Sequence, residues 1–400
     1  MFTQEQIKTL ARQTPSKIIL LVLDGLGGLP KPDTGKTELE TALTPNFDKL
    51  VSKSICGLSE PVGPGITSGS APGHTALFGY DPVLVNIGRG VLEAVGIDFP
   101  IEPDDVLGRG NFCTVDKNGI ITDRRAGRIS TELNASLCPL LKMKIEDIQV
   151  LTAPVKEYRF VICFRGSGLR DNVSETDPQR EGLAPTQVTA LSAGAIKTAN
   201  IANQFVERAK KILSDKHPAN MLLLRGFSRK PELLSMGSIY KLKPAAIATY
   251  PMYRGLARLV GMDILPTGST FADEIKTLKE HYNDYDFFFV HVKALDAAGE
   301  DGDFDRKVKV LEELDKVLPE LLSLKPDVLV VTGDHSTPAM LKGHSWHTVP
   351  TILYSQYCRP DKVAEFSESA FLQGGLGNFP ATQIMPLAMA NALKLNKYGA

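Results

Sequence analysis

Two short apolar segments, far apart in the chain, each end in side chains that can bind a cation. Residues 17–23 lead into Asp24, and residues 328–333 lead into Asp334 and His335. Both segments are rich in Ile, Val and Leu and end at a glycine, which predicts buried parallel strands. The carboxyl ends of such strands face the ligand crevice of an α/β sheet. We therefore expect these three side chains to form a divalent metal site. The alternative is that the two aspartates only cap the helices that follow.

Composition limits the classes of protein that this chain can belong to. Its 400 residues predict two domains, and 43% hydrophobic with 23% charged residues is typical of a globular protein. A net charge of −1 gives no sign of a nucleic-acid or acidic-membrane partner. No apolar stretch has the length of a membrane span, and the first residues do not resemble a signal peptide. Five cysteines without CxxC spacing indicate reduced thiols and a cytoplasmic protein, either a monomer or a homo-oligomer.

The pattern of elements predicts a discontinuous α/β core with a smaller insertion. The first hundred residues alternate strand-like and helical segments. Residues 111–122 then place two strand-like runs around an Asp-Lys-Asn-Gly turn, which predicts an antiparallel hairpin. From residue 186 the α/β alternation resumes. We expect a core of mostly parallel sheet flanked by helices over 1–100 and 186–400, and an α+β domain over 101–185.

The resumed part contains one long amphipathic pattern and several apolar runs. Residues 190–213 predict a helix, and 221–224, 245–249 and 286–291 predict strands. We expect all of them in the core sheet and its covering helices.

A serine in the segment Gly65–His74 is a candidate nucleophile. Ser70 lies in a Gly- and Pro-rich loop before a short helical pattern. A helix N-terminus offers free N–H groups to an anion. A serine hydroxyl still needs a base or a metal to become nucleophilic. The alternative is an ordinary loop serine, because several other Ser and Thr residues lie nearby.

Further oxygen and nitrogen donors follow another predicted strand and a later loop. Asp296 and Glu300 are spaced to lie on one side of a helix, while His344 and His347 add two imidazoles. With the first three residues, these donors suffice for two metal ions that would hold a transferring phosphoryl group. The alternative is that both histidines are surface residues. For Asp303 we expect only a cap on the helix that begins at Phe304.

Arginines occur beside glycines, at strand ends and after the hairpin. Guanidinium groups bind phosphate and carboxylate in bidentate fashion, so the arginines predict a small substrate that carries both groups. Each could instead be a solvated surface charge. The candidates are Arg89, Arg124, Arg128, Arg225 and Arg254.

Taken together, the motifs resemble the alkaline phosphatase superfamily and, more narrowly, the archaeal-type cofactor-independent phosphoglycerate mutases. The resemblance covers nearly the whole chain and keeps the order of the motifs. The segments that carry it are Asp24-Gly-Leu-Gly-Gly28, Thr44-Pro-Asn-Phe-Asp48, the loop with Ser70, His74-Thr-Ala-Leu-Phe-Gly-Tyr-Asp-Pro82, Gly88-Arg-Gly90, Asn111-Phe-Cys-Thr-Val-Asp116, Asp123-Arg-Arg-Ala-Gly-Arg128, Leu223-Leu-Arg-Gly226, His291-Val-Lys293 and Thr332-Gly-Asp-His-Ser-Thr-Pro338.

The resemblance implies an alkaline-phosphatase-like core and interconversion of 2-phosphoglycerate and 3-phosphoglycerate in glycolysis and gluconeogenesis, without 2,3-bisphosphoglycerate. It implies that Ser70 becomes phosphorylated and that the insertion holds the glycerate. It also implies two divalent ions, Mn²⁺ or Mg²⁺. The implied ligands are Asp24, Ser70, Asp334 and His335 for one ion, and Asp296, Glu300 and His344 for the other. His74 and the five arginines would bind substrate.

Three positions depart from the family pattern. Ala71 stands where an acidic residue is usual, Glu300 replaces a histidine, and His347 replaces Asn or Asp. We expect His347 to be able to supply the missing imidazole, one helical turn from His344. The departures keep two alternatives open. One is a metal-dependent phosphomonoester or phosphonate hydrolase on the same core, and the other is a non-catalytic sensor of a phosphorylated metabolite.

Overall fold

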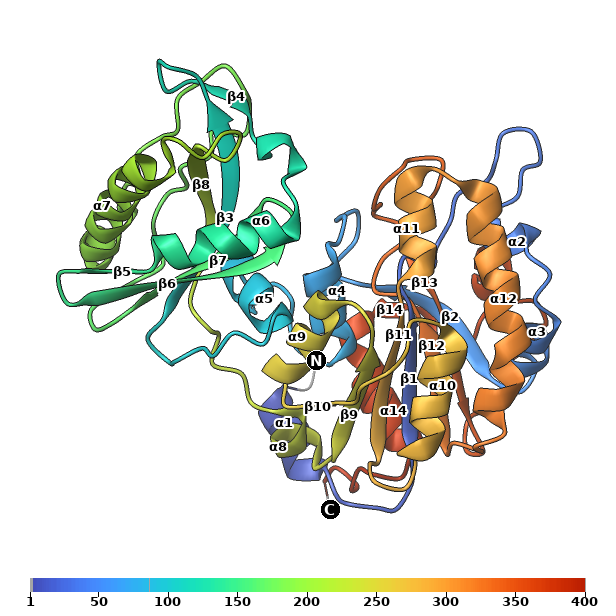
Figure 1. The fold of residues 1–400 in the computed structure, drawn as a ribbon. Helices are drawn as coiled ribbons and strands as arrows, with labels where there is room; N and C mark the ends of the chain where they lie inside the picture. Colours follow the sequence, from blue (N-terminus) through green and yellow to red (C-terminus); the bar gives the residue numbers. More distant parts are fainter. Residues whose placement is uncertain (1–2, 86, 400) are drawn as a thin grey trace. The chain divides into compact units, whose positions relative to one another are not determined.

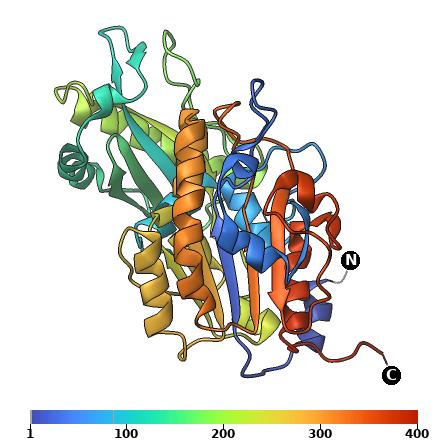
Figure 2. The ribbon, with the colours of Figure 1, turned by 90° about the vertical axis from the view of Figure 1, so that its right-hand side faces the viewer.

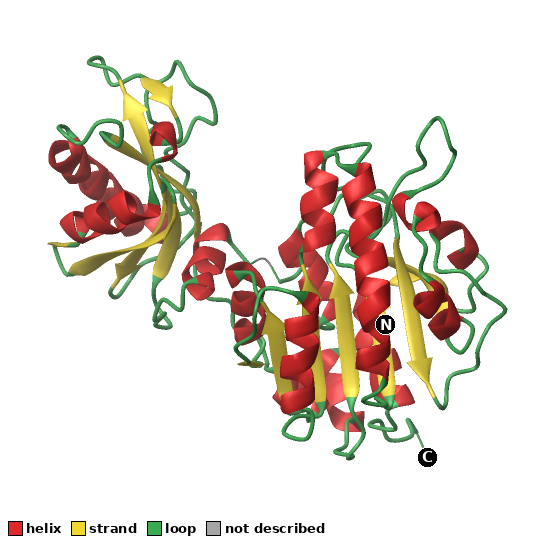
Figure 3. Cartoon of the chain, turned by 45° about the vertical axis from the view of Figure 1, so that its right-hand side comes forward, coloured by secondary structure: helices red, strands yellow, loops and turns green. Residues whose placement is uncertain are grey.

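A computed structural model describes residues 3–85 and 87–399 and divides the chain into two compact units. The first, called here the core unit, consists of residues up to 85 and from 233 onward. The second, called here the inserted unit, spans Ile87–Glu232. Figure 3 shows that each unit has strands of its own, covered by helices of its own.

The centre of the core unit is the strand that precedes Asp24. β1 (Ile18–Leu23) is buried at every residue and pairs in parallel with β11 (Phe287–Val292) on one side and β12 (Val328–Thr332) on the other. Continuous Ile, Val, Leu and Phe runs form these strands because both faces of the sheet are covered. The predicted strands at residues 17–23, 286–291 and 328–333 are therefore confirmed, and their carboxyl ends lie at one edge.

The sheet of the core unit is mixed but mostly parallel. Only the pairs β12–β13 and β13–β2 are antiparallel among the neighbours described. This confirms the expected α/β class. In spatial order the strands are β10 (Asp263–Ile264), β9 (Pro244–Ala248), β11, β1, β12, β13 (Val349–Ser355), β2 (Ile55–Glu60) and β14 (Gly377–Pro380).

Helices cover both faces of this sheet, as Figures 1 and 2 show. On one face, apolar residues of α3, α10 and α12 share a buried cluster with alternate residues of β1 and β12. α14 lies on the other face (Figure 1). None of the helices in the described residues combines the length and the apolarity that crossing a bilayer would need. The helices are α1 (Gln4–Leu10), α2 (Glu38–Thr41), α3 (Pro45–Val51), α4 (Ser70–Leu77), α8 (Met236–Tyr240), α9 (Pro251–Leu259), α10 (Phe271–Glu280), α11 (Ala294–Asp301), α12 (Phe304–Leu322), α13 (Glu368–Phe371), η4 (Ala381–Gln383) and α14 (Ile384–Asn391).

The inserted unit is an α+β domain around an antiparallel sheet. The predicted hairpin is present as β3 and β4, and a second buried cluster joins the sheet to α6 and α7. The elements are α5 (Arg89–Gly96), β3 (Val106–Val115), β4 (Ile121–Asp123), η1 (Ala126–Arg128), α6 (Thr131–Leu137), η2 (Cys138–Leu141), β5 (Met143–Ile145), β6 (Ile148–Lys156), β7 (Arg159–Arg165), η3 (Ala193–Ala195), α7 (Ile196–Leu213) and β8 (Met221–Ser228).

The inserted unit extends beyond the expected 101–185 at both ends. β8, expected in the core sheet, instead pairs antiparallel with β3, and α7 covers the same sheet. The physical reason is that Leu222 and Leu224 are buried in one cluster with Phe112 and Phe160. An apolar strand pattern predicts burial but does not identify the sheet in which the strand is buried.

Candidate active site

Three neighbouring strands of the core unit end in polar side chains at one edge of the sheet. Asp24 follows β1, Asp334 and His335 follow β12, and β11 ends with His291 inside it and Lys293 just after it. Parallel pairing of these strands brings their carboxyl ends together. The juxtaposition predicted from the two apolar segments is therefore present.

The candidate nucleophile lies beside this edge. Ser70 is the first residue of α4, not a residue of the loop before it, and its Oγ lies 3.3 Å from His335 Nε2. α4 packs closely on the loop after β12, because a Cβ at Gly73 would lie 2.2 Å from the carbonyl oxygen of Asp334. This contact requires glycine and fixes the distance between Ser70 and the strand end.

Asp24, Asp334 and His335 form a first group of possible metal ligands. Their ligand atoms lie within 4.8 Å of one another and all three side chains are fully buried. Both carboxylate oxygens of Asp24 and Oδ2 of Asp334 lack a hydrogen-bond partner among the described residues. Buried carboxylates without donors are costly unless a cation compensates them. The donor set therefore fits a divalent cation.

Asp296, His335 and His344 form a second group of the same kind. His344 Nε2 lies 3.5 Å from Asp296 Oδ1, and the rings of His335 and His344 stack with centroids 3.6 Å apart. Nδ1 of His344 is paired with the carbonyl oxygen of Ser68, which leaves Nε2 to face the group. Because His335 belongs to both groups, the two candidate sites are contiguous.

Electrostatic coupling within the groups is strong. Burial would raise the pKa of Asp334, but His335 and His74 outweigh it and hold that pKa well below its usual value. Burial would lower the pKa of His335, yet Asp334 and other carboxylates raise it to about 9. His335 therefore carries a proton at neutral pH in the metal-free protein. A bound cation would take the place of that proton.

Sequence reasoning missed several side chains that contact the groups. His291 Nε2 and Lys293 Nζ lie 3.1 and 3.2 Å from Asp24 Oδ2. Tyr253 stacks on His291 with ring centroids 3.7 Å apart. Thr337 Oγ1 donates to Asp296 Oδ1 at 2.7 Å. The strand-end positions of His291 and Lys293 were a usable signal, whereas nothing local in the sequence marks Tyr253 or Thr337.

Two expected ligands lie outside both groups. Glu300 is largely exposed, and its Oε1 is 3.8 Å from His344 Nε2, so it lies beside the second group without being part of it. His347 is not one helical turn from His344, because residues 344–347 form no helix. Instead, His347 Nδ1 contacts Ser345 Oγ at 3.0 Å, and the ring stacks on Trp346. The expectation that His347 supplies an imidazole is therefore wrong for this structure.

His74, expected to bind substrate, is fully buried instead. Its Nδ1 lies 2.8 Å from the carbonyl oxygen of Ser70 and 3.1 Å from Asp334 Oδ2. The reason is its position on α4, one turn after Ser70, on the face that packs against the sheet. His74 thus connects the nucleophile's backbone to a candidate ligand. Asp303 caps α12 as expected, since its side chain accepts from the backbone N–H of Arg306.

Within the inserted unit, three of the five candidate arginines lie around two acidic residues. Arg124 makes a bidentate pair with Asp177 at 3.1 and 2.7 Å, and Arg225 lies 3.4 Å from both Asp177 and Glu175. Partial burial and the nearby guanidinium groups of Arg109 and Arg225 lower the pKa of Arg89. These groups form a basic cluster that an anion would stabilise.

The other two candidate arginines lie elsewhere. Arg128 is 3.8 Å from Glu157 at the surface of the inserted unit. Arg254 belongs to the core unit, on α9, and follows Tyr253 directly.

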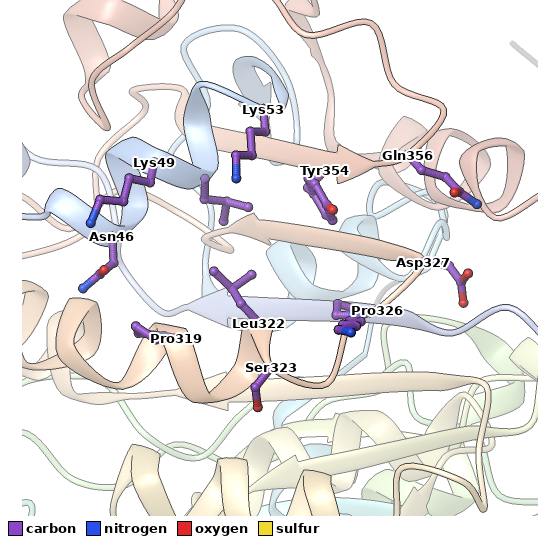
Figure 4. A pocket seen from close by; sticks show the side chains of 12 residues that line it. Asn46, Lys49, Lys53, Pro319, Leu322, Ser323, Pro326, Asp327, Tyr354 and Gln356 are labelled. Carbon is purple, nitrogen blue, oxygen red and sulfur yellow. The ribbon is translucent and has the colours of Figure 1, made fainter.

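A cavity of about 640 Å³ is separate from the groups just described (Figure 4). It lies in the core unit between α3 and the last turns of α12, and Asp327, at the amino end of β12, is among its lining residues. None of the candidate ligands lines it. The chemistry inferred here belongs to the opposite, carboxyl edge of the sheet.

Comparisons with known proteins agree with this arrangement. A family model described as 2,3-bisphosphoglycerate-independent phosphoglycerate mutase matches residues 52–220. A Thermotoga petrophila protein named probable 2,3-bisphosphoglycerate-independent phosphoglycerate mutase is 51% identical, over 99% of each chain. A Thermus thermophilus protein of the same name is 50% identical, over 98% of each chain.

Two solved structures are similar over nearly the whole chain. A cofactor-independent phosphoglycerate mutase from Thermoplasma acidophilum is 30% identical, with a TM-score of 0.76 over 94% of this chain and 100% of that one. A protein from Pyrococcus horikoshii is 28% identical, with a TM-score of 0.83 over 97% of this chain and 100% of that one.

Proposed function

The chain belongs to the 2,3-bisphosphoglycerate-independent phosphoglycerate mutase family, and on that premise we propose that Ser70 carries the phosphoryl group between the two hydroxyls of glycerate. Independence from 2,3-bisphosphoglycerate follows from the family. The observation that carries the role of Ser70 is its place at the start of α4, with Oγ 3.3 Å from His335 in a group of buried carboxylates.

The reaction needs two successive transfers. Ser70 Oγ attacks the phosphorus of the phosphoglycerate, so that the P–Oγ bond forms while the bond from phosphorus to the substrate oxygen breaks and that oxygen takes up a proton. The other hydroxyl of glycerate then attacks the phosphoserine, loses its proton, and restores the serine hydroxyl. The α4 N-terminus offers free backbone N–H groups to the phosphoryl oxygens in both steps.

We propose that Asp24, Ser70, Asp334 and His335 hold one divalent ion and that Asp296 and His344 hold a second, with Glu300 as a further oxygen donor. Glu300 would reach that ion by a change of side-chain rotamer, since its carboxylate is exposed and lies 3.8 Å from His344. The carboxylate-rich donor set favours Mn²⁺ or Mg²⁺. Bound ions would lower the pKa of the Ser70 hydroxyl and counter charge on the transferring phosphoryl group.

Lys293 supplies a fixed positive charge to the same site. Burial would lower its pKa, but Asp24 and Asp296 raise it, so the ammonium group stays charged. It also contacts Tyr253 Oη at 3.0 Å, which holds the group in place. We propose that Lys293 balances the ligand carboxylates and orients the phosphoryl group.

For the inserted unit we propose a role in holding glycerate. Arg89, Arg124 and Arg225 supply the guanidinium groups, and Asp177 orients two of them. Holding the glycerate while excluding water is what separates a mutase from a phosphatase. We also propose that the enzyme acts in glycolysis and gluconeogenesis in the cytoplasm, where its free cysteines would stay reduced.

The test is to incubate the purified protein with 3-phosphoglycerate and Mn²⁺, to couple 2-phosphoglycerate to enolase, and to assay free phosphate in parallel. Enolase signal without phosphate supports the mutase. Phosphate without enolase signal would move the assignment to a phosphomonoester hydrolase. The position of Glu300 outside both ligand groups is the observation that keeps this second candidate.

A further inference from the structure

A fully buried lysine lies behind the candidate metal groups. Lys307 is on α12, and its Nζ donates to the carbonyl oxygen of Gly27 at 3.0 Å and to that of Thr337 at 2.9 Å. Gly27 belongs to the loop that follows Asp24, and Thr337 to the loop that follows His335. One ammonium group therefore joins the two loops that carry the candidate ligands.

A buried glutamate joins the same two loops through their N–H groups. Glu38, on α2, accepts from the N–H of Leu29 at 3.2 Å with one oxygen and from the N–H of Ala339 at 2.8 Å with the other. Its Oε1 is 3.9 Å from Lys307 Nζ. The lysine thus binds carbonyl groups of both loops, and the glutamate binds their amide groups.

The contacts leave the loops little freedom. A Cβ at Gly27 would lie 1.9 Å from Ser336 Oγ, and a Cβ at Gly28 would lie 2.0 Å from Glu38 Oε2. Thr337 in turn donates to Asp296 and lies 2.9 Å from His335 Nδ1. A shift of the second loop would therefore move ligand atoms of both groups.

A buried ion pair is weak evidence for stability, because its desolvation offsets much of its attraction. Groups that hold metal ligands from behind commonly change metal affinity 10- to 100-fold. We infer that the Lys307–Glu38 pair sets the spacing of the two ligand-bearing loops and thereby the affinity of the site for divalent cations. This inference rests on the proposed metal site. It makes Lys307 and Glu38 positioning residues, since neither contacts the reacting atoms.

The test compares Lys307→Met with Lys394→Met by Mn²⁺ titration calorimetry and thermal unfolding of the full chain. Lys394 is a matched control. It is equally buried and donates to Thr14 O at 2.7 Å, near the amino edge of the sheet. Both variants should melt at lower temperature, but only Lys307→Met should raise the Kd for Mn²⁺, by at least tenfold. An unchanged Kd in Lys307→Met would overturn the inference.

Two further variants keep the outcomes distinct. Asp334→Asn removes a proposed ligand, so a wild-type Kd in that variant would overturn the metal site and this inference with it. Loss of Mn²⁺ binding in Asp334→Asn alone would overturn only the inference. If Lys307→Met does not fold, Glu38→Gln takes its place, because the amide oxygen can still accept from Ala339. It should raise the Kd at least threefold, and a wild-type Kd would count against the pair.

Discussion

At the scale of single residues, charge balance explains the composition of the site. Asp24, Asp296 and Asp334 are fully buried within one cluster, where their mutual repulsion is poorly screened. In the metal-free protein, Lys293 and the proton of His335 offset part of this charge. Two divalent ions would offset the rest. The cluster is therefore costly for folding and useful for binding cations.

Replacing the nucleophile should separate chemistry from metal binding. Ser70→Ala should lower turnover by on the order of 10³ or more, since no phosphoserine can form. It should leave the fold intact, because Oγ has only one protein contact, to His335. Enolase-coupled kinetics and Mn²⁺ titration measure the two effects. Ser68→Ala is the control, since its hydroxyl bonds only a neighbouring carbonyl. Activity of Ser70→Ala within tenfold of wild type would remove Ser70 from the mechanism.

Removing the glutamate that stands in place of a histidine tests its role as a ligand. Glu300→Ala should raise the Mn²⁺ concentration for half-maximal activity about tenfold, because the second group loses an oxygen donor. Asp301→Ala is the control, because this exposed neighbour pairs with Arg306 instead. The measurement is a metal titration of initial rates. Identical titration curves for Glu300→Ala and wild type would assign Glu300 to the surface only.

At the scale of elements, local patterns predicted the strands that form the site. β1, β11 and β12 are continuous apolar runs that end in polar residues, so both their burial and the edge they share follow from sequence. The same patterns did not predict that β8 joins the inserted sheet. Tyr253, Thr337 and Lys307 reach the site only through tertiary packing, which no local period reveals.

One helix of the core unit carries a buried acid away from the site. Burial raises the pKa of Glu274 on α10 to about 9, and the nearby Asp273 adds to the shift. Between the ordinary value and 9 the folded state keeps a proton that the unfolded state releases. This stabilisation is complete below about pH 4.5 and is lost as pH rises toward 9.

Glu274→Gln should remove this dependence. Its stability relative to wild type should increase by on the order of 1 kcal/mol per pH unit between pH 5.5 and 8. Urea unfolding across that range is the measurement, and Glu280→Gln, an exposed position on the same helix, is the control. A stability difference that does not change with pH would show that the Glu274 carboxyl is ionised in the folded protein.

At the scale of the whole molecule, two hydrophobic clusters divide the chain. One cluster lies entirely within the core unit, and the other lies entirely within Ile87–Glu232. The chain enters and leaves the inserted unit at adjacent points, because Val91 N–H donates to Ser228 Oγ at 3.2 Å. Such an insertion leaves each unit with a complete core of its own.

The inserted unit should therefore fold when it is expressed alone. A fragment of residues 87–232 should give a cooperative thermal transition and a dispersed amide NMR spectrum, because it contains β8 and α7 with the rest of its cluster. The fragment 101–185, which matches the boundaries expected from sequence, is the control. It lacks the strand that pairs with β3 and the helix that supplies Phe205, so it should remain unfolded. A folded 101–185 fragment would instead place the boundary where the change in sequence pattern puts it, and would make α7 and β8 additions to a smaller domain.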